Sequence, residues 1–277
     1  MTSPSAKLSD EELLNQGISI VKAVNDKGII LRILGSAAFA IHSQNDDECR
    51  EAFTKLGRLG EGKPVFTDLD MATYGKQSKS LEKMLQKEMR LTPNMMVNTI
   101  YGNKRLMFFH PDRLYSLDIF IDKLEYSHDV IFGKGPGSGR LELDYPTLDL
   151  ADLVLEKIQI HQINQKDLLD LTVLFMSHDV ETTDGKEMIN GKYIAQVLAN
   201  DWGFWYDGVN NLKHTLVVAK GCLDEKKISS GAYDRVEMRT QKLLKYVEEE
   251  PKTFQWKVRE RVGASKPWYR EVDDLRR

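Results

Sequence analysis

The stretch Phe66-Thr67-Asp68-Leu69-Asp70-Met71 places two acidic residues two positions apart among apolar neighbours. On a β-strand, alternate side chains project from one face, so Asp68 and Asp70 would share the face opposite Leu69 and Met71. An Asp-x-Asp pair taken alone is more often a turn or an exposed strand face. Two carboxylates this close repel each other, however, and they are tolerated when a cation such as Mg²⁺ lies between them. The stretch therefore predicts a strand that carries a metal-binding pair.

A third acid and a candidate anion site accompany this pair. Asp118 lies between apolar residues in Leu117-Asp118-Ile119-Phe120, which predicts a neighbouring strand that brings a third carboxylate to the same place. The apolar run 29–34 predicts a strand, and Gly35-Ser36 leads from it into a helix over 37–42. Backbone N–H groups at a helix start bind phosphate oxygens, and a glycine there lets the backbone approach closely.

The composition is ordinary for a soluble globular protein and does not by itself identify a functional class. The 277 residues suffice for one large domain or two modest ones, and 39 Lys+Arg against 42 Asp+Glu give a net charge of −3, which neither indicates nor excludes a nucleic-acid partner. Cys49 and Cys222 are far apart and have no neighbouring Cys or His at a spacing that suits zinc. No apolar run spans a bilayer and the first residues lack a signal pattern, so we expect a cytoplasmic protein without membrane contact.

The first half of the chain alternates helical and strand patterns. Ser9 and Glu12 form a capping-box pattern ahead of a helix that runs to about Asn25. Further helices are predicted over 48–59 and 77–90, and strands over 65–74, 94–101, 105–110 and 114–122, with the last three as an antiparallel meander.

The glycine-rich stretch 133–139 predicts a flexible hairpin loop. A phosphate-binding P-loop needs Gly-Lys followed by Ser or Thr at the end of its spacing and then a helix, whereas Gly133-Lys134 opens this run. The residues 140–143 that follow it predict a strand, as a hairpin requires.

From Asp149 onward the patterns are helical. Helices are predicted over 150–162, 165–177, 190–200, 212–220, 231–250 and 256–262. We place the boundary near Tyr145-Pro146, with an α/β domain over 1–146 and a helical domain over 147–277. The predicted fold class is α+β, a mixed sheet with flanking helices followed by a helical domain.

Two helical stretches carry candidate polar groups. Lys157 and Asp167 stand on successive helices, where they would either reach a shared cleft or form a surface ion pair of little consequence. The aromatic run Asp201-Trp202-Gly203-Phe204-Trp205-Tyr206-Asp207 would either stack a base or have a core or interdomain role, and the core or interdomain role is expected.

The order of these motifs resembles the nucleotidyltransferase superfamily, and the later Lys157 and Asp167 narrow the resemblance to its AbiEii-type branch of toxin or abortive-infection proteins. The resemblance covers about residues 29–175. It implies a nucleotidyltransferase-like sheet, with Asp68, Asp70 and Asp118 as the catalytic metal ligands. It further implies that Gly35, Ser36, Lys157 and Asp167 bind the nucleotide, the last two from a helical domain that completes the cleft.

The activity implied is Mg²⁺-dependent transfer of a nucleoside monophosphate from an NTP to a hydroxyl acceptor, with Mn²⁺ as an alternative ion. RNA ends, a protein and a small molecule are all compatible acceptors, and an antitoxin partner is implied by the resemblance alone. Two alternatives stay open. A catalytically retired scaffold would act as a binding module, and a metal-dependent phosphohydrolase would use the same acids with water as acceptor.

Overall fold

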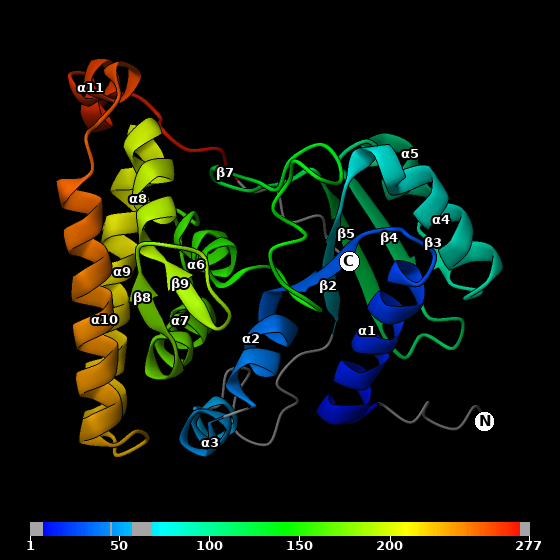
Figure 1. Ribbon diagram of the computed structural model, residues 1–277, viewed down its shortest axis with the longest axis horizontal. Coiled ribbons are helices and arrows are strands. Elements are labelled where there is room, and N and C mark those ends of the chain that lie inside the picture. The colour runs from blue at the N-terminus through cyan, green and yellow to red at the C-terminus, as the bar shows by residue number, and fades with distance from the viewer. Residues whose placement is uncertain (1–7, 45, 57–67, 272–277) are drawn as a thin grey trace. The chain divides into compact units, whose positions relative to one another are not determined.

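The computed structural model of the chain describes residues 8–44, 46–56 and 68–271 (Figure 1). These residues form two compact units. Unit 1 takes 8–41, 68–124 and 131–149, and unit 2 takes 42–44, 46–56, 125–130 and 150–271. The class is α+β: a mixed five-stranded sheet with helices in the N-terminal part and a mostly helical C-terminal region, as the sequence predicts.

The sheet of unit 1 has the strand order β1-β2-β5-β4-β3. Its strands are β1 (Leu31–Leu34), β2 (Leu69–Thr73), β3 (Thr92–Pro93), β4 (Arg105–Phe109) and β5 (Ser116–Ile121). The pair β2–β5 is parallel and the other neighbours are antiparallel. The predicted antiparallel pairing of the strands over 105–110 and 114–122 is confirmed in β4 and β5. The sequence analysis did not predict the parallel pair β2–β5, in which a long connection lets the two strands run in the same direction.

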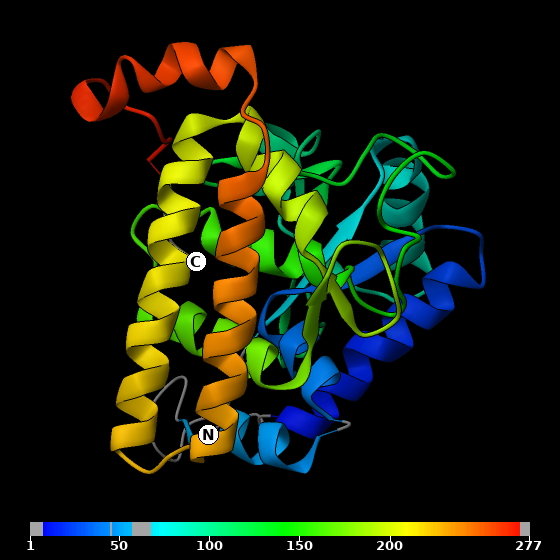
Figure 2. The same cartoon turned by 60° about the vertical axis from the view of Figure 1, so that its left-hand side comes forward.

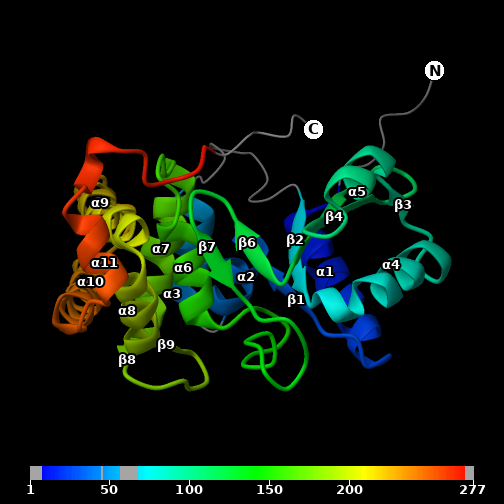
Figure 3. The same cartoon turned by 90° about the horizontal axis from the view of Figure 1, so that it is seen from above.

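Helices cover the apolar face of this sheet. They are α1 (Asp10–Asn25), the single turn η1 (Gly75–Gln77), α4 (Ser78–Lys87) and α5 (Met95–Tyr101). The α1 start has the predicted capping box, in which the Ser9 side chain and Glu12 satisfy each other's backbone N–H groups. Figure 3 shows α1 beside β1 and β2. Gly17 lets α1 approach closely, since a Cβ there would lie 3.1 Å from Leu69 Cδ2. The core beneath it includes Ile33, Leu69 and Ile119, all fully buried.

The predicted strand over 94–101 is wrong, because these residues form α5. The Asn94 side chain accepts a hydrogen bond from the Val97 N–H and so caps the helix, and Asn98 Oδ1 accepts the Met107 N–H at 2.7 Å. Val97 is buried, whereas Met95 is 70% exposed and Ile100 is 60% exposed.

The predicted strand over 140–143 is also wrong, so the glycine-rich stretch is a loop but not a hairpin. The Arg140 N–H donates to Phe132 O, the Leu143 N–H closes a turn on Arg140 O, and the Leu141 N–H donates to the Tyr74 hydroxyl. The backbone donors are thereby used without a strand partner. A Cβ on Gly139 would lie 2.1 Å from the Tyr74 hydroxyl oxygen, so a glycine is required where this loop packs on Tyr74.

Unit 2 is built from helices and a short strand pair. Its elements are α3 (Asp47–Lys55), α6 (Leu150–Ile158), α7 (Gln165–Ser177), β8 (Asp179–Glu181), β9 (Met188–Asn190), α8 (Gly191–Asn200), α9 (Trp202–Asp224), α10 (Ser230–Glu249), α11 (Phe254–Glu260) and the turn η2 (Gly263–Ser265). The long helices α9 and α10 lie side by side (Figure 2). Most of these helices lie where the sequence predicts them, although α9 starts ten residues earlier and absorbs the aromatic run.

Three elements each contain a point at which the chain passes from one unit to the other. They are α2 (Gly35–Ser43), β6 (Lys123–Glu125) and β7 (Asp129–Ile131), of which the two strands pair with each other. None of the helices in the described ranges is long and apolar enough to span a membrane. Cys49 and Cys222 are buried and not joined, and burial raises the pKa of both thiols, that of Cys49 to about 12, which makes them poor nucleophiles.

Candidate functional site

Two of the predicted site residues, Asp70 and Asp118, lie side by side on interior strands of the unit 1 sheet. Strand register places Leu34 opposite Asp70, and Asp70 beside Asp118 on the parallel neighbour. Residues in register on adjacent strands project from the same face about 4.8 Å apart. Asp70 and Asp118 therefore lie next to each other, at the point where β1 passes into α2.

Asp68 immediately precedes β2 and is partly exposed, whereas Asp118 is 2% exposed. Phe66 and Thr67, the remainder of the motif that precedes it, lie outside the described residues. We call Asp68, Asp70 and Asp118 the acid group. Its donor atoms are all carboxylate oxygens, the hard ligands that Mg²⁺ prefers, so the residue types fit the predicted ion.

Gly35 has a specific structural reason to be glycine. Its φ of +67° lies in the left-handed region, and a Cβ added there would lie 2.9 Å from Asp70 Oδ2. Ser36 follows as a buried residue in the first turn of α2. The Gly35 backbone at the strand-to-helix junction therefore lies close against the Asp70 carboxylate.

The sequence reasoning missed the partner of Asp118. Arg105 on β4 donates from Nε to Asp118 Oδ1 at 2.7 Å and from its terminal nitrogen to Oδ2, so the guanidinium grips both carboxylate oxygens. The signal was present in the alternation of the strands. Arg105 pairs with Phe120, two residues beyond Asp118, so it shares the face of the acid group.

A cavity in unit 1 lies away from the acid group. It has a volume of about 580 Å³ and is lined by the start of α4, by α5 and by Leu106 and Ile121. Leu106 pairs with Ile119, and Ile121 stands three residues from Asp118, so these side chains project from the opposite face of the sheet. This cavity does not serve the carboxylates.

Lys157 and Asp167 do meet, but in unit 2 and as a buried pair. Lys157 Nζ lies 2.8 Å from Asp167 Oδ1, 3.3 Å from Glu156 Oε1 and 3.2 Å from Asp170 Oδ2. The contact to Asp170 has ion-pair distance without hydrogen-bond geometry. The Lys157 side chain is only 6% exposed, so the alternative of a surface ion pair is wrong. Three carboxylates surround one ammonium group, so the positive charge of Lys157 is balanced by its neighbours within unit 2.

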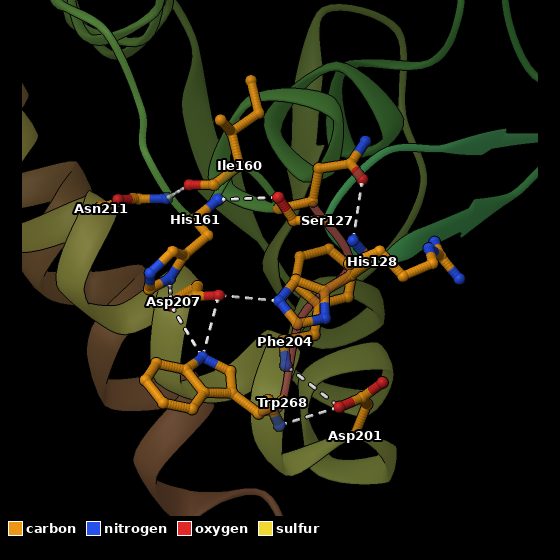
Figure 4. Close-up of polar contacts among 12 residues, drawn as sticks. Ser127, His128, Ile160, His161, Asp201, Phe204, Asp207, Asn211 and Trp268 are labelled. Atoms are coloured by element: carbon orange, nitrogen blue, oxygen red, sulfur yellow. Dashed lines mark hydrogen bonds and ion pairs between the residues drawn. The ribbon is translucent and has the colours of Figure 1, made fainter. Parts of the chain in front are cut away.

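A second polar network in unit 2 is centred on Asp207 (Figure 4). Asp207 bonds to His128 Nε2 at 2.8 Å, to His161 Nδ1 at 2.9 Å and to Trp268 Nε1 at 3.2 Å. Burial alone would raise the pKa of Asp207, but these hydrogen bonds together outweigh it and the net pKa is lowered.

Packing explains the role of this network. His128 stacks on Phe204 with parallel rings and His161 stacks on Tyr269. The carboxylate therefore joins α9 to the segment before α7 and to the segment after η2. The aromatic run has the core role that the sequence predicts, since Trp202 and Phe204 are both buried.

No protein-family model, curated protein or solved structure matches the chain.

Proposed function

We propose that unit 1 is a nucleotidyltransferase, which moves a nucleoside monophosphate from an NTP to a hydroxyl acceptor and releases pyrophosphate. The observation that supports this most is the register of Asp70 with Asp118 beside the left-handed Gly35. Paired carboxylates and a glycine that starts a helix are complementary to a metal–triphosphate.

In this proposal Asp68 and Asp70 hold Mg²⁺, or Mn²⁺ in its place. The ion, when bound, neutralises the triphosphate charge as the α-phosphorus is attacked and pyrophosphate leaves. Gly35 admits the phosphate chain close to the backbone, and the Ser36 hydroxyl with the first N–H groups of α2 binds the terminal phosphates.

Asp118 would take the acceptor proton or contribute to a second metal position. Either role needs a carboxylate oxygen that Arg105 has released, because both oxygens accept from its guanidinium. A bound triphosphate offers Arg105 a competing set of oxygens, and guanidinium groups bind phosphate well. We therefore add Arg105 to the proposed site, as a residue whose guanidinium binds Asp118 in the absence of nucleotide and a phosphate group in its presence.

The nucleotide-binding roles of Lys157 and Asp167 stay predictions. Both residues belong to unit 2, and the ammonium group is surrounded by three carboxylates. The nucleotidyltransferase family, the acceptor and the antitoxin partner likewise rest on the sequence resemblance.

One observation favours a second candidate, a retired scaffold that binds a partner without catalysis. The Arg105–Asp118 pair satisfies the third carboxylate with a protein cation, so Asp118 needs no metal ion to be stable. Such a scaffold would keep the fold and lose the transfer step.

The experiment is an incubation of the purified chain with each α-³²P-labelled NTP, Mg²⁺ or Mn²⁺, and panels of RNA, protein and small hydroxylated acceptors. Label transferred to an acceptor by the wild type and not by Asp70→Asn supports the transferase. Label released to water as free nucleotide indicates a phosphohydrolase instead. NTP binding in calorimetry without either product indicates the retired scaffold, and transfer by Asp70→Asn refutes the assigned site.

A further inference from the structure

A cluster of two histidines and one glutamate lies in unit 2, separate from every residue used above. His42 is in the last turn of α2, His178 directly follows α7, and Glu187 directly precedes β9. Each of the three offers one ligand atom, and these atoms lie within 4.8 Å of one another. The two imidazole rings meet edge to face with centroids 5.7 Å apart. We call these residues the histidine group.

The spacing within the histidine group is that of metal ligands. Glu187 Oε2 lies 3.0 Å from His42 Nδ1 and 3.4 Å from His178 Nδ1. Two atoms bound tetrahedrally to zinc at about 2.0–2.1 Å are about 3.3 Å apart. A zinc ion could therefore be accepted with small side-chain adjustments.

One ring nitrogen of His178 lacks the partner that a buried polar atom requires. His178 Nδ1 faces the Glu187 backbone oxygen at 3.2 Å, whereas Nε2 is buried and makes no hydrogen bond with any residue in the described ranges. The His42 backbone is near enough to act on the ring's charge, but not in hydrogen-bonding geometry. The nitrogen that lies 3.4 Å from Glu187 Oε2 is Nδ1, so an ion bound through Nδ1 would replace its contact with the Glu187 backbone oxygen.

The burial of the histidine group encloses the two histidines and leaves the glutamate accessible. The His42 and His178 side chains are 3% and 6% exposed, while Glu187 is 34% exposed and leaves a route for an ion.

The backbone at Glu187 is strained. Its φ of +57° lies in the left-handed region, which residues other than glycine adopt rarely. Such positions persist where the surrounding structure requires the side chain to be at a particular place, and functional sites are a common reason.

We propose that His42, His178 and Glu187 bind one zinc ion through one nitrogen of each histidine and a carboxylate oxygen. Nitrogen donors favour zinc and similar transition ions over Mg²⁺, so this site is distinct in kind from the acid group. The ion joins the end of α2, the end of α7 and the loop between β8 and β9. Three protein ligands leave a further coordination position for water or another ligand.

The test uses the untagged full-length chain, stripped of metal with a chelator and titrated with ZnCl₂ by calorimetry in excess Mg²⁺, which occupies the acid group. We expect about one zinc per chain and a rise in the melting temperature of about 5 °C at 100-fold excess over Kd. Cobalt(II) should give the visible absorption bands of a low-coordinate nitrogen and oxygen site.

The variants are Glu187→Gln and His178→Asn, with His214→Asn as the control, because His214 is an exposed histidine on α9 of the same unit. Zinc affinity should fall at least 100-fold in the first two and remain unchanged in the control. Glu187 is partly exposed, so its amide variant still decides the matter if His178→Asn fails to fold. Wild-type zinc binding that is absent, or equal in Glu187→Gln, means that the cluster is held by hydrogen bonds alone and overturns the proposal.

Discussion

The acid group of unit 1 and the histidine group of unit 2 are built in opposite ways. Asp70 and Asp118 of the acid group lie in register on adjacent strands, and Asp68 directly precedes one of these strands. The histidine group joins residues 145 positions apart, His42 and Glu187, through the ends of helices and a loop. A site on a regular element leaves a periodic trace in the sequence, whereas a site made from element ends leaves none.

The two groups also differ in how they are satisfied without a metal ion. Arg105 neutralises Asp118 in the acid group, whereas His178 Nε2 in the histidine group is buried without a hydrogen bond. Binding of a metal ion by Asp118 would therefore require the loss of its contact with Arg105, whereas His178 has a ring nitrogen without a hydrogen bond to lose among the described residues. The predictions below test each side of this difference.

The largest expected effect is the loss of nucleotide transfer in Asp70→Asn. The amide loses the charge that would hold the ion against the triphosphate, so transfer should fall about 1,000-fold while the far-ultraviolet circular dichroism is unchanged. The assay is label transfer from the α-³²P-labelled NTP. Asp112→Asn is the matched control, since its side chain is 82% exposed in a turn of the same unit. Equal losses in both variants would contradict a specific role for Asp70.

The largest loss of unfolding free energy is expected for Arg105→Met. This change leaves the Asp118 carboxylate, whose side chain is 3% exposed, without its guanidinium, and should cost about 3 kcal/mol of unfolding free energy. Adding Asp118→Asn should recover part of the loss, because the buried charge is then gone. Urea unfolding of the four members of the cycle measures this. A cost below about 1 kcal/mol for Arg105→Met would mean that the pair does not hold Asp118 in solution.

Asp207 supplies a comparison with the histidine group, because the histidine nitrogens that it contacts are hydrogen-bonded, whereas His178 Nε2 is not, in the part of the chain that the structure describes. Asp207→Asn should lower the unfolding free energy by about 2 kcal/mol at pH 7. The lowered pKa of Asp207 means that the unfolded chain takes up the proton more readily. Its stabilisation is therefore present above about pH 4 and is lost as pH falls through the native pKa.

Urea unfolding at a series of pH values checks this sign. The difference between wild type and Asp207→Asn should shrink below about pH 4. A difference that grows on acidification would show that the carboxylate is not the ionised partner of His128 and His161.

The smallest expected effect is the difference in unfolding free energy between Gly35→Ala and Gly28→Ala. Both glycines have positive φ, but a Cβ on Gly28 meets nothing within 4 Å while one on Gly35 meets Asp70. Gly28→Ala should cost about 1 kcal/mol from the backbone alone, and Gly35→Ala about 1 kcal/mol more. Thermal unfolding gives both values. Equal costs would mean that Asp70 moves aside freely and that the close approach is not built into the site.

Sequence reasoning reached the elements with strong local patterns. The Ser9–Glu12 capping box, the two helices around Lys157 and Asp167, and the order of strand, Gly35-Ser36 and acidic strand are all present. It failed over 94–101, where β-branched and aromatic residues suggested a strand and the Asn94 cap decided for a helix. Local propensity is weak where a cap and neighbouring contacts compete with it.

Other features depended on tertiary packing and could not be read from spacing. The burial of Lys157 among three acids needs the helices to be placed first. The Arg105–Asp118 pair was within reach, since the antiparallel register of β4 and β5 fixes it, but only once that register was considered. The histidine group was out of reach, because nothing near His42 in the sequence points to His178 or Glu187.

The most direct measurement is anomalous diffraction from crystals soaked with Mn²⁺ and a non-hydrolysable NTP analogue. The account predicts an anomalous peak within bonding distance of the Asp68 and Asp70 carboxylates, with the triphosphate on the Gly35-Ser36 junction and Arg105 turned from Asp118 towards a phosphate. A peak elsewhere, or bound nucleotide with Asp68 and Asp70 free of metal, would contradict it.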